Sequence, residues 1–322
     1  MPTPSLLIVT RRDATEVDGV IDAVGEMGVR VVRWNLCQFP EMESASSYTM
    51  APFPKLSILG DLTPQAGWIQ SLGVFSVSSS LDGLPREVAL SECQAFIYGV
   101  CATLSCTWLN DVEAIARASN KLIQLRLAGA LGVPMPPTIV TSDWQDVVRF
   151  RQIHGACVVK AISQSYWGYG LRELKTYTVA LDRFEKLLPD ALKYGPAIVQ
   201  KEVNKKTELR VTVVGGRCFT VAFARSRCPE QAIDVRQIDY QRYSYLFTAT
   251  KEWPAVEEAS FRLVRELRLG YAALDWVVDE MGHPWFLECN PLGSFKWYEL
   301  CGANGITEAI AEALLGLTRH ES

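Results

Sequence analysis

The stretch YAALDWVVDEMGHPWFLECNPLGSFKWYE, residues Tyr271–Glu299, decides the fold. It holds two apolar runs separated by the turn-forming residues Asp279–Gly282, and this pattern predicts an antiparallel hairpin. Counting back from the turn places Asp275 roughly opposite Glu288 or the residue before it. Side chains alternate along a strand, so Glu288 and Asn290 share one face. The hairpin therefore predicts two carboxylates and an amide oxygen close together at a strand end.

Oxygen ligands of this kind suit a hard divalent cation. Mg²⁺ usually takes one or two protein carboxylates together with substrate phosphates. The acids lie inside apolar runs, where an unpaired charge is costly. We therefore predict a magnesium site formed by Asp275, Glu288 and Asn290. The plainer interpretation is an edge hairpin whose acids are solvated.

The composition narrows the class of protein. A chain of 322 residues is long enough for two or three packed units. A net charge of −4 gives no electrostatic basis for binding nucleic acid or an anionic membrane. Neither a secretory signal nor an apolar run of about 18 residues is present in the sequence. Nine scattered cysteines without CxxC pairs suggest reduced thiols, so we expect a cytoplasmic protein.

The N-terminal part has the pattern of a β-α-β unit. Ser5–Thr10 is a short apolar run, Thr15–Met27 has helical apolar spacing, and Val29–Trp34 is a second strand. This opening predicts a parallel sheet. A long helix is expected at residues 86–106.

A helix is also predicted at residues 120–131, with its apolar face formed by Leu122, Leu125, Ala128 and Leu131. The extended segment VPMPPT at 133–138 marks a domain boundary. Strands and helices then alternate up to residue 203, and from residue 209 the chain is rich in strands, including VRQIDY. The order predicts a mixed α/β (α+β) fold.

Lys160 lies within the apolar strand VVKAI, and Gly168 and Gly170 follow it in a polar loop at Ser163–Leu171. A lysine in such a strand needs an anionic partner if it is buried. A lysine followed by a glycine-bearing loop can hold and cover phosphates. The alternative is an edge lysine whose ammonium reaches solvent.

Gln200, Lys201 and Val203 belong to a strand that leads out of one unit into the next. The backbone of such a strand can hydrogen-bond an adenine edge, although a plain interdomain crossover has the same pattern.

Charged residues follow in pairs. Glu208 and Arg210 share a strand face, Arg225 alternates with apolar residues on the partner strand, and Asp234 and Arg236 form a second i, i+2 pair. Arginine forks fit phosphate and carboxylate oxygens bidentately. Cross-strand ion pairs of little energetic value are the alternative.

In this order of features the chain resembles the ATP-grasp superfamily from Asn120 to its C-terminus. The resemblance implies a pre-grasp domain at 1–118, a central lid domain at 119–203 and a C-terminal domain with an antiparallel sheet at 204–322. It also implies ATP and Mg²⁺ as cofactors. By the resemblance, the site residues fall into five groups: Lys121 and Lys160 at the phosphates, covered by Gly168 and Gly170; Gln200, Lys201 and Val203 at the adenine; Glu208 at the ribose; Asp275, Glu288 and Asn290 at magnesium; and Arg210 and Arg225 at the transferring phosphoryl group.

A narrower resemblance is to the ATP-grasp maturases of graspetides, the microviridin-type ribosomal peptides. NKLIQLRLAGALGVPMPPTIVTSD, TELRVTVVGG, IDVR and LECNPLGSFKWYEL are similar to their motifs, and RVVRWNLCQFP resembles their pre-grasp domain. It implies a precursor peptide, leader plus core, as substrate, and ester or amide macrocycles as product. We expect Asp234 and Arg236 to contact substrate and the leader to dock near residues 163–195. A homodimer is compatible with this family.

Two other functions stay open. One is an ATP-grasp ligase acting on a free amino acid, a dipeptide or a protein tail. The other is a nucleotide-binding regulatory protein without catalysis, against which the intact Asp275, Glu288 and Asn290 speak.

Overall fold

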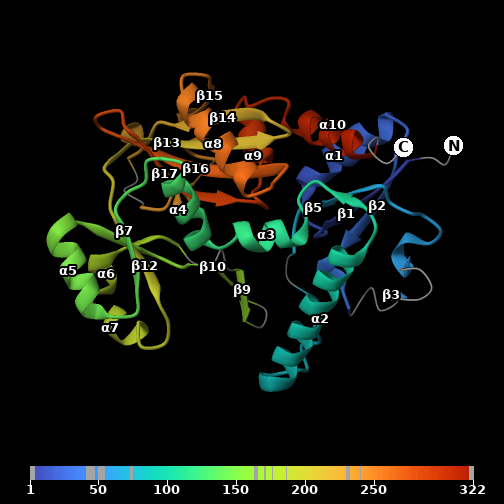
Figure 1. Ribbon diagram of the computed structural model, residues 1–322, viewed down its shortest axis with the longest axis horizontal. Helices are drawn as coiled ribbons and strands as arrows, with labels where there is room; N and C mark the ends of the chain where they lie inside the picture. The colour runs from blue at the N-terminus through green and yellow to red at the C-terminus, as the bar shows by residue number, and fades with distance from the viewer. Residues whose placement is uncertain are drawn as a thin grey trace.

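The structure is a computed structural model. It describes all residues except 1–3, 41–47, 50–54, 73–74, 163–165, 170–171, 176, 186, 230–232, 240 and 319–322. Three main sheets form the framework (Figure 1), with two short two-stranded hairpins beside them. Within the described residues no helix is long and apolar enough to cross a membrane.

The first sheet is parallel, with strand order β2-β1-β5-β6. All six residues of its central strand are buried, because α1 and α10 cover one face and α2 and α3 belong to the core on the other. The predicted β-α-β opening is confirmed. The elements of this region are β1 (Ser5–Thr10), α1 (Thr15–Glu26), β2 (Arg30–Asn35), β3 (Tyr48–Thr49), β4 (Lys55–Leu56), β5 (Ala66–Ile69), α2 (Gly83–Thr103), β6 (Thr107–Trp108), α3 (Val112–Ala118) and α4 (Lys121–Ala130).

The second sheet has the order β11-β8-β12-β7 and carries three helices that pack on it through Val147, Leu181, Leu188 and Val199. Its elements are β7 (Thr138–Thr141), α5 (Trp144–His154), β8 (Cys157–Lys160), β11 (Val179–Ala180), α6 (Leu181–Phe184), α7 (Leu188–Ala191) and β12 (Ala197–Lys201). Beside it, β9 (Tyr166–Tyr169) and β10 (Arg172–Lys175) form an antiparallel hairpin. The expectation of a loop at 163–171 is therefore wrong where this segment is described.

The third sheet is antiparallel, with the order β15-β14-β13-β16-β17, as predicted. Its elements are β13 (Lys205–Val214), β14 (Arg217–Phe223), β15 (Phe247–Thr250), α8 (Pro254–Glu266), β16 (Tyr271–Asp279), β17 (Pro284–Asn290), α9 (Lys296–Leu300) and α10 (Ile306–Thr318). Residues Val235–Gln237 form a 3-10 helix. The prediction of a strand at VRQIDY is therefore wrong for these three residues.

The C-terminal helix α10 joins the first and third sheets in one core. It lies beside α1 (Figure 1) and buries Ile310 and Leu314 in a cluster that also contains Val20 of α1 and Tyr271 of β16. Packing thus fixes the third sheet against the N-terminal sheet. The division into three domains at 118 and 203 stays a prediction.

The buried face of α4 differs from the predicted one. Its buried residues are Lys121, Gln124 and Ala128, whereas Leu122 is 42% exposed. The prediction is confirmed for Ala128 and wrong for Leu122, because two polar side chains of this helix contact the neighbouring strand β17 instead.

Candidate functional site

The β16–β17 hairpin has the predicted register. Asp275 pairs with Glu288 across the two strands, and a β-bulge directly after this pair leaves Leu287 without a partner in the ladder. The turn closes by a hydrogen bond of 3.0 Å from the Gly282 N–H to the Asp279 carbonyl. Cys289 is fully buried on the opposite face. Asp275, Glu288 and Asn290 therefore line the same cavity.

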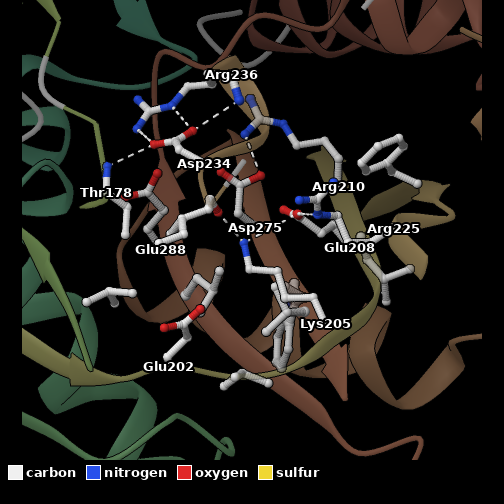
Figure 2. Close-up of a pocket in the computed structure, with 18 of the residues that line it drawn as sticks. Thr178, Glu202, Lys205, Glu208, Arg210, Arg225, Asp234, Arg236, Asp275 and Glu288 are labelled. Carbon is white, nitrogen blue, oxygen red and sulfur yellow. Dashed lines mark hydrogen bonds and ion pairs between the residues drawn. The ribbon is translucent and has the colours of Figure 1, made fainter. Parts of the chain in front are cut away.

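This cavity, of about 500 Å³, lies between the second and third sheets. Figure 2 shows charged side chains from several elements converging on it. The predicted site residues that line it are Lys160, Gln200, Lys201, Val203, Glu208, Arg210, Arg225, Asp234, Arg236, Asp275, Glu288 and Asn290. Three others are not among the lining residues: Lys121 lies behind Glu288, Gly168 lies on β9, and Gly170 is outside the described residues.

Each of the two acids on this cavity wall has a cationic partner, and both side chains are half-buried. Arg210 Nη1 lies 2.8 Å from Asp275 Oδ1, and Lys121 Nζ lies 3.4 Å from Glu288 Oε2. Burial raises the pKa of Asp275 above its ordinary value, and Arg210 offsets only part of this rise. Burial acts in the same direction on Glu288, but Lys121 and Lys160 outweigh it and lower the pKa of this carboxyl. Glu288 is thus the acid that stays ionised most readily.

The oxygen set fits a hard cation that shares its coordination with phosphate. Two carboxylates and the Asn290 amide line one wall, and the Asn290 Oδ1 also accepts a hydrogen bond of 3.0 Å from the Leu292 N–H. In the described part of the chain, no three His, Cys, Asp or Glu side chains lie close enough to hold a metal by themselves. Such a set suits Mg²⁺, which keeps positions for waters and phosphates.

Lys160 lies on β8, between β11 and β12, and so is not on an edge strand. Its Nζ donates a hydrogen bond of 2.7 Å to Gln200 Oε1, and the Gln200 amide donates one of 2.8 Å to Thr138 Oγ1. Burial lowers the pKa of Lys160 to about 8. Among the described residues, no carboxylate makes a hydrogen bond to Lys160 Nζ, so this cation can receive an anionic ligand.

Lys205 is a cavity residue that the sequence did not single out. Its Nζ lies 2.6 Å from the Ile233 carbonyl and 3.3 Å from Glu208 Oε1, and Arg225 Nε is 3.8 Å from the same carboxylate. Burial raises the pKa of Glu208 despite these cations. The segment NKKT looks like a polar turn, but β13 begins at Lys205, and a bulge before Thr207 lets Lys205 reach Glu208. Strand alternation gives no signal for Lys205, because the bulge breaks the alternation between it and Glu208.

Asp234 and Arg236 form a compact pair at the cavity mouth. Arg236 Nε donates a hydrogen bond of 2.8 Å to Asp234 Oδ1, and the Thr178 N–H donates one of 3.0 Å to Oδ2. Asp234 is 6% exposed, while the Arg236 side chain is 51% exposed and stacks over Tyr177. The pair therefore ties the residue before β11 to the connection between β14 and β15, and the Arg236 cation faces the cavity.

Two buried amides position the hairpin, and neither was predicted. Gln124 of α4 bonds both backbone groups of Cys289, at 2.7 Å and 2.8 Å. Asn110 donates to the carbonyls of Tyr271 and Pro291 and accepts from the Gly270 and Tyr271 N–H groups. The open end of the hairpin, where β16 begins and β17 ends, is thus held by side chains from the α2–α4 region.

No protein-family model and no curated protein matches the sequence. Solved structures do match. A RiPP-associated ATP-grasp ligase of Chryseobacterium gregarium, in complex with ADP and a leader and core peptide, is similar at a TM-score of 0.81 and 23% identity, over 98% of this chain and 97% of that one. The macrocyclase MdnC of Microcystis aeruginosa MRC, bound with precursor peptide MdnA, is similar at a TM-score of 0.79 and 26% identity. The likeness covers 97% of this chain and 99% of that one.

A third similar structure, the D-cycloserine synthetase DcsG, has a TM-score of 0.62 and 16% identity, over 98% of this chain and 100% of that one. All three likenesses extend over nearly the whole chain, so the described elements follow one common arrangement. The chain therefore has the ATP-grasp fold, and its predicted resemblance to ATP-grasp ligases and graspetide macrocyclases is confirmed.

Proposed function

We propose that this protein is an ATP-dependent ligase that closes ester or amide macrocycles in a ribosomal precursor peptide. The observation that carries the proposal is the cavity itself, in which Asp275, Glu288 and Asn290 face the cations Lys160 and Arg210. The similarity to MdnC over 97% of the chain, at 26% identity, supports a peptide as substrate.

In this proposal the cavity binds ATP between the second and third sheets. Gln200, Lys201 and Val203 line the adenine, Glu208 receives the ribose, and Lys160 contacts phosphate oxygens. Asp275, Glu288 and Asn290 hold Mg²⁺, which supplies charge neutralisation when bound. Lys121 Nζ lies 3.4 Å from Glu288 Oε2 and keeps this carboxylate ionised. Gly168 on β9, with Gly170 after it in the sequence, covers the phosphates.

The reaction proceeds in two steps. A carboxylate oxygen of an Asp or Glu side chain in the peptide attacks the γ-phosphorus, and ADP leaves. A Ser or Thr hydroxyl or a Lys amine then attacks the acyl carbon and displaces phosphate. Arg210 and Arg225 stabilise the phosphoryl charge, and Asp234 and Arg236 contact the peptide. Positioning and charge neutralisation supply most of the rate in this kind of chemistry.

The leader docks, in this proposal, on the unit that carries α7. Leu187 is 64% exposed and Tyr194 is 92% exposed, one on each side of that helix. Large exposed apolar side chains of this kind suit an apolar peptide segment. Tyr194→Ala is expected to raise KM for the full precursor and not for a core peptide supplied without its leader. An equal change in KM for both peptides would contradict leader docking on this surface.

Mass spectrometry of a precursor peptide co-expressed with the protein tests the proposal. Each closed ring appears as the loss of one water. An unchanged peptide mass, together with ATP-dependent ligation of a free amino acid, would favour a small-molecule ligase. The D-cycloserine synthetase has the same fold. ATP binding without turnover on either substrate class would favour the regulatory protein.

A further inference from the structure

A buried carboxylate lies outside the cavity and is connected to its rim. Glu16, in the first turn of α1, is 8% exposed. One of its oxygens accepts a hydrogen bond of 2.6 Å from Gln70 Nε2, and the other accepts one of 2.5 Å from Ser294 Oγ. Both donors are neutral groups. A buried carboxylate without a cationic partner is costly to stability, so its retention calls for an explanation.

Thr10, at the buried end of this hydrogen-bond chain, fixes its orientation. Thr10 Oγ1 donates a hydrogen bond of 2.7 Å to Gln70 Oε1, which turns the amide N–H of Gln70 toward Glu16. Thr10 is fully buried. The N-terminal end of α1 adds a favourable field for an anion. The network therefore fixes the Glu16 side chain so that its second oxygen points to the Ser294 hydroxyl.

Ser294 is an exposed residue of the cavity rim that cannot move freely. Its carbonyl accepts a hydrogen bond of 3.3 Å from Arg210 Nη2, and the preceding carbonyl, of Gly293, accepts one from the Tyr271 hydroxyl. A Cβ at position 293 would lie 2.6 Å from both Ala273 Cβ and Arg210 Nη2, so only glycine fits there. These contacts therefore fix the position of Ser294 next to Arg210.

The position of Ser294 relative to the proposed site suggests its task, so this inference rests on the proposed function. The acyl carbon must lie beside Arg210, because that residue neutralises the phosphoryl group. Adenine and magnesium residues occupy the other walls of the cavity. The attacking group then arrives from the side of the N-terminal sheet, where Ser294 meets Glu16.

We propose that the Ser294–Glu16 pair accepts the proton of the attacking hydroxyl or ammonium group. The Ser294 oxygen takes this proton while its own proton passes to Glu16. The nucleophile's freed electron pair forms the new bond to the acyl carbon, and the bond from that carbon to the phosphate oxygen breaks as phosphate leaves. An amine nucleophile gives its second proton to the departing phosphate. Glu16 later returns its proton to water. A positioned acceptor of this kind contributes roughly 10²–10⁴-fold to rate.

The test compares two nucleophiles in the full-length protein with its precursor peptide, Mg²⁺ and ATP. Added hydroxylamine is already a neutral nucleophile and converts the acyl phosphate to a hydroxamate without help from a base. Ring closure and hydroxamate formation are both read by mass. Glu16→Gln is the main variant. It keeps the tie to Ser294, because Gln70 can flip its amide and Thr10 can donate or accept.

We expect Glu16→Gln and Ser294→Ala to lower the ratio of ring closure to hydroxamate about a hundredfold. Ser294→Thr keeps the hydroxyl and should restore much of the ratio. Glu26→Gln removes an exposed carboxylate from the same helix and should leave the ratio unchanged. An unchanged ratio in Glu16→Gln, whether both products fall together or neither falls, would overturn the inference. Failure of the unaltered protein to form either product would instead refute the proposed function.

Discussion

Helices α4 and α10 both pack against the third sheet, but they bury opposite kinds of side chain. α10 buries Ile310 and Leu314 in the core shared with α1, whereas α4 buries Lys121 and Gln124 against β17. α10 therefore holds two sheets together by removing apolar surface from water. α4 holds one strand, the one that carries Glu288, by specific polar contacts.

The difference separates stability from site geometry. A helix whose apolar stripe faces a core can be replaced by another of similar volume, because the hydrophobic effect has no direction. A buried amide that bonds both backbone groups of one residue fixes that residue's position. Changes in α10 should thus act on stability alone, and changes in α4 should act on the site as well.

The largest expected effect on stability is at Leu314, which is fully buried. Leu314→Ala should lower the free energy of unfolding by about 2–5 kcal/mol, from lost burial and the cavity left behind. ATP affinity of the folded protein should not change. Urea unfolding and calorimetry measure the two quantities, and Leu300→Ala, at a position 73% exposed, is the control. A loss of ATP affinity without a loss of stability would contradict the claim that α10 acts on stability alone.

Gln124→Met keeps the size of the side chain and removes its hydrogen bonds to Cys289. Buried backbone groups left without partners cost about 1–3 kcal/mol each, so stability should fall on the order of 2 kcal/mol. Peptide-dependent ATP turnover should fall further than this loss explains, because β17 shifts. Gln145→Met changes an exposed glutamine and serves as the matched control. Full turnover in a destabilised Gln124→Met would limit α4 to a structural role.

Lys160→Met should weaken ATP binding about tenfold to a hundredfold, because a charge-assisted hydrogen bond contributes about 1.5–3 kcal/mol. Stability should change little, since the methionine stem replaces the lysine stem. Calorimetry with ATP and Mg²⁺ measures the effect, and the exposed Lys193→Met is the control. Unchanged affinity would support the interpretation of Lys160 as a lysine without a ligand.

The smallest effect is a pH dependence. Burial lowers the pKa of Lys160 to about 8, so its charge is present below pH 8 and is lost as the pH rises through that value. ATP affinity should fall as the pH rises from 7 to 9, by up to about tenfold per unit above 8. Lys160→Arg stays charged over this range and should bind ATP with little pH dependence. The same dependence in both proteins would assign the titration to another group.

The sequence predicts the acid-bearing hairpin well, because a tight turn and period-two alternation fix the register of Asp275 and Glu288. The parallel opening follows in the same way from apolar runs such as Ser5–Thr10. These signals are local. The site residues that lie on regular strands could therefore be named before the fold was known.

What the sequence could not supply depends on irregular or distant geometry. Lys205 joins the cavity through a bulge, and Asp234 and Arg236 meet on a 3-10 turn that strand alternation does not describe. The contact between Glu16 and Ser294 spans 278 positions. The buried face of α4 differs from the predicted one because the pattern of leucines marks an apolar face, whereas Gln124 is buried through its hydrogen bonds to Cys289.

The most direct test of the account is the Mg²⁺ dependence of ATP binding in the unaltered protein and in Asp275→Asn/Glu288→Gln. Calorimetry with ATP, with and without Mg²⁺, supplies the numbers. We expect Mg²⁺ to tighten ATP binding to the unaltered protein and to have no such effect on the double variant, which should also lose ADP formation. A double variant that still binds ATP more tightly with Mg²⁺ and still forms ADP would contradict it.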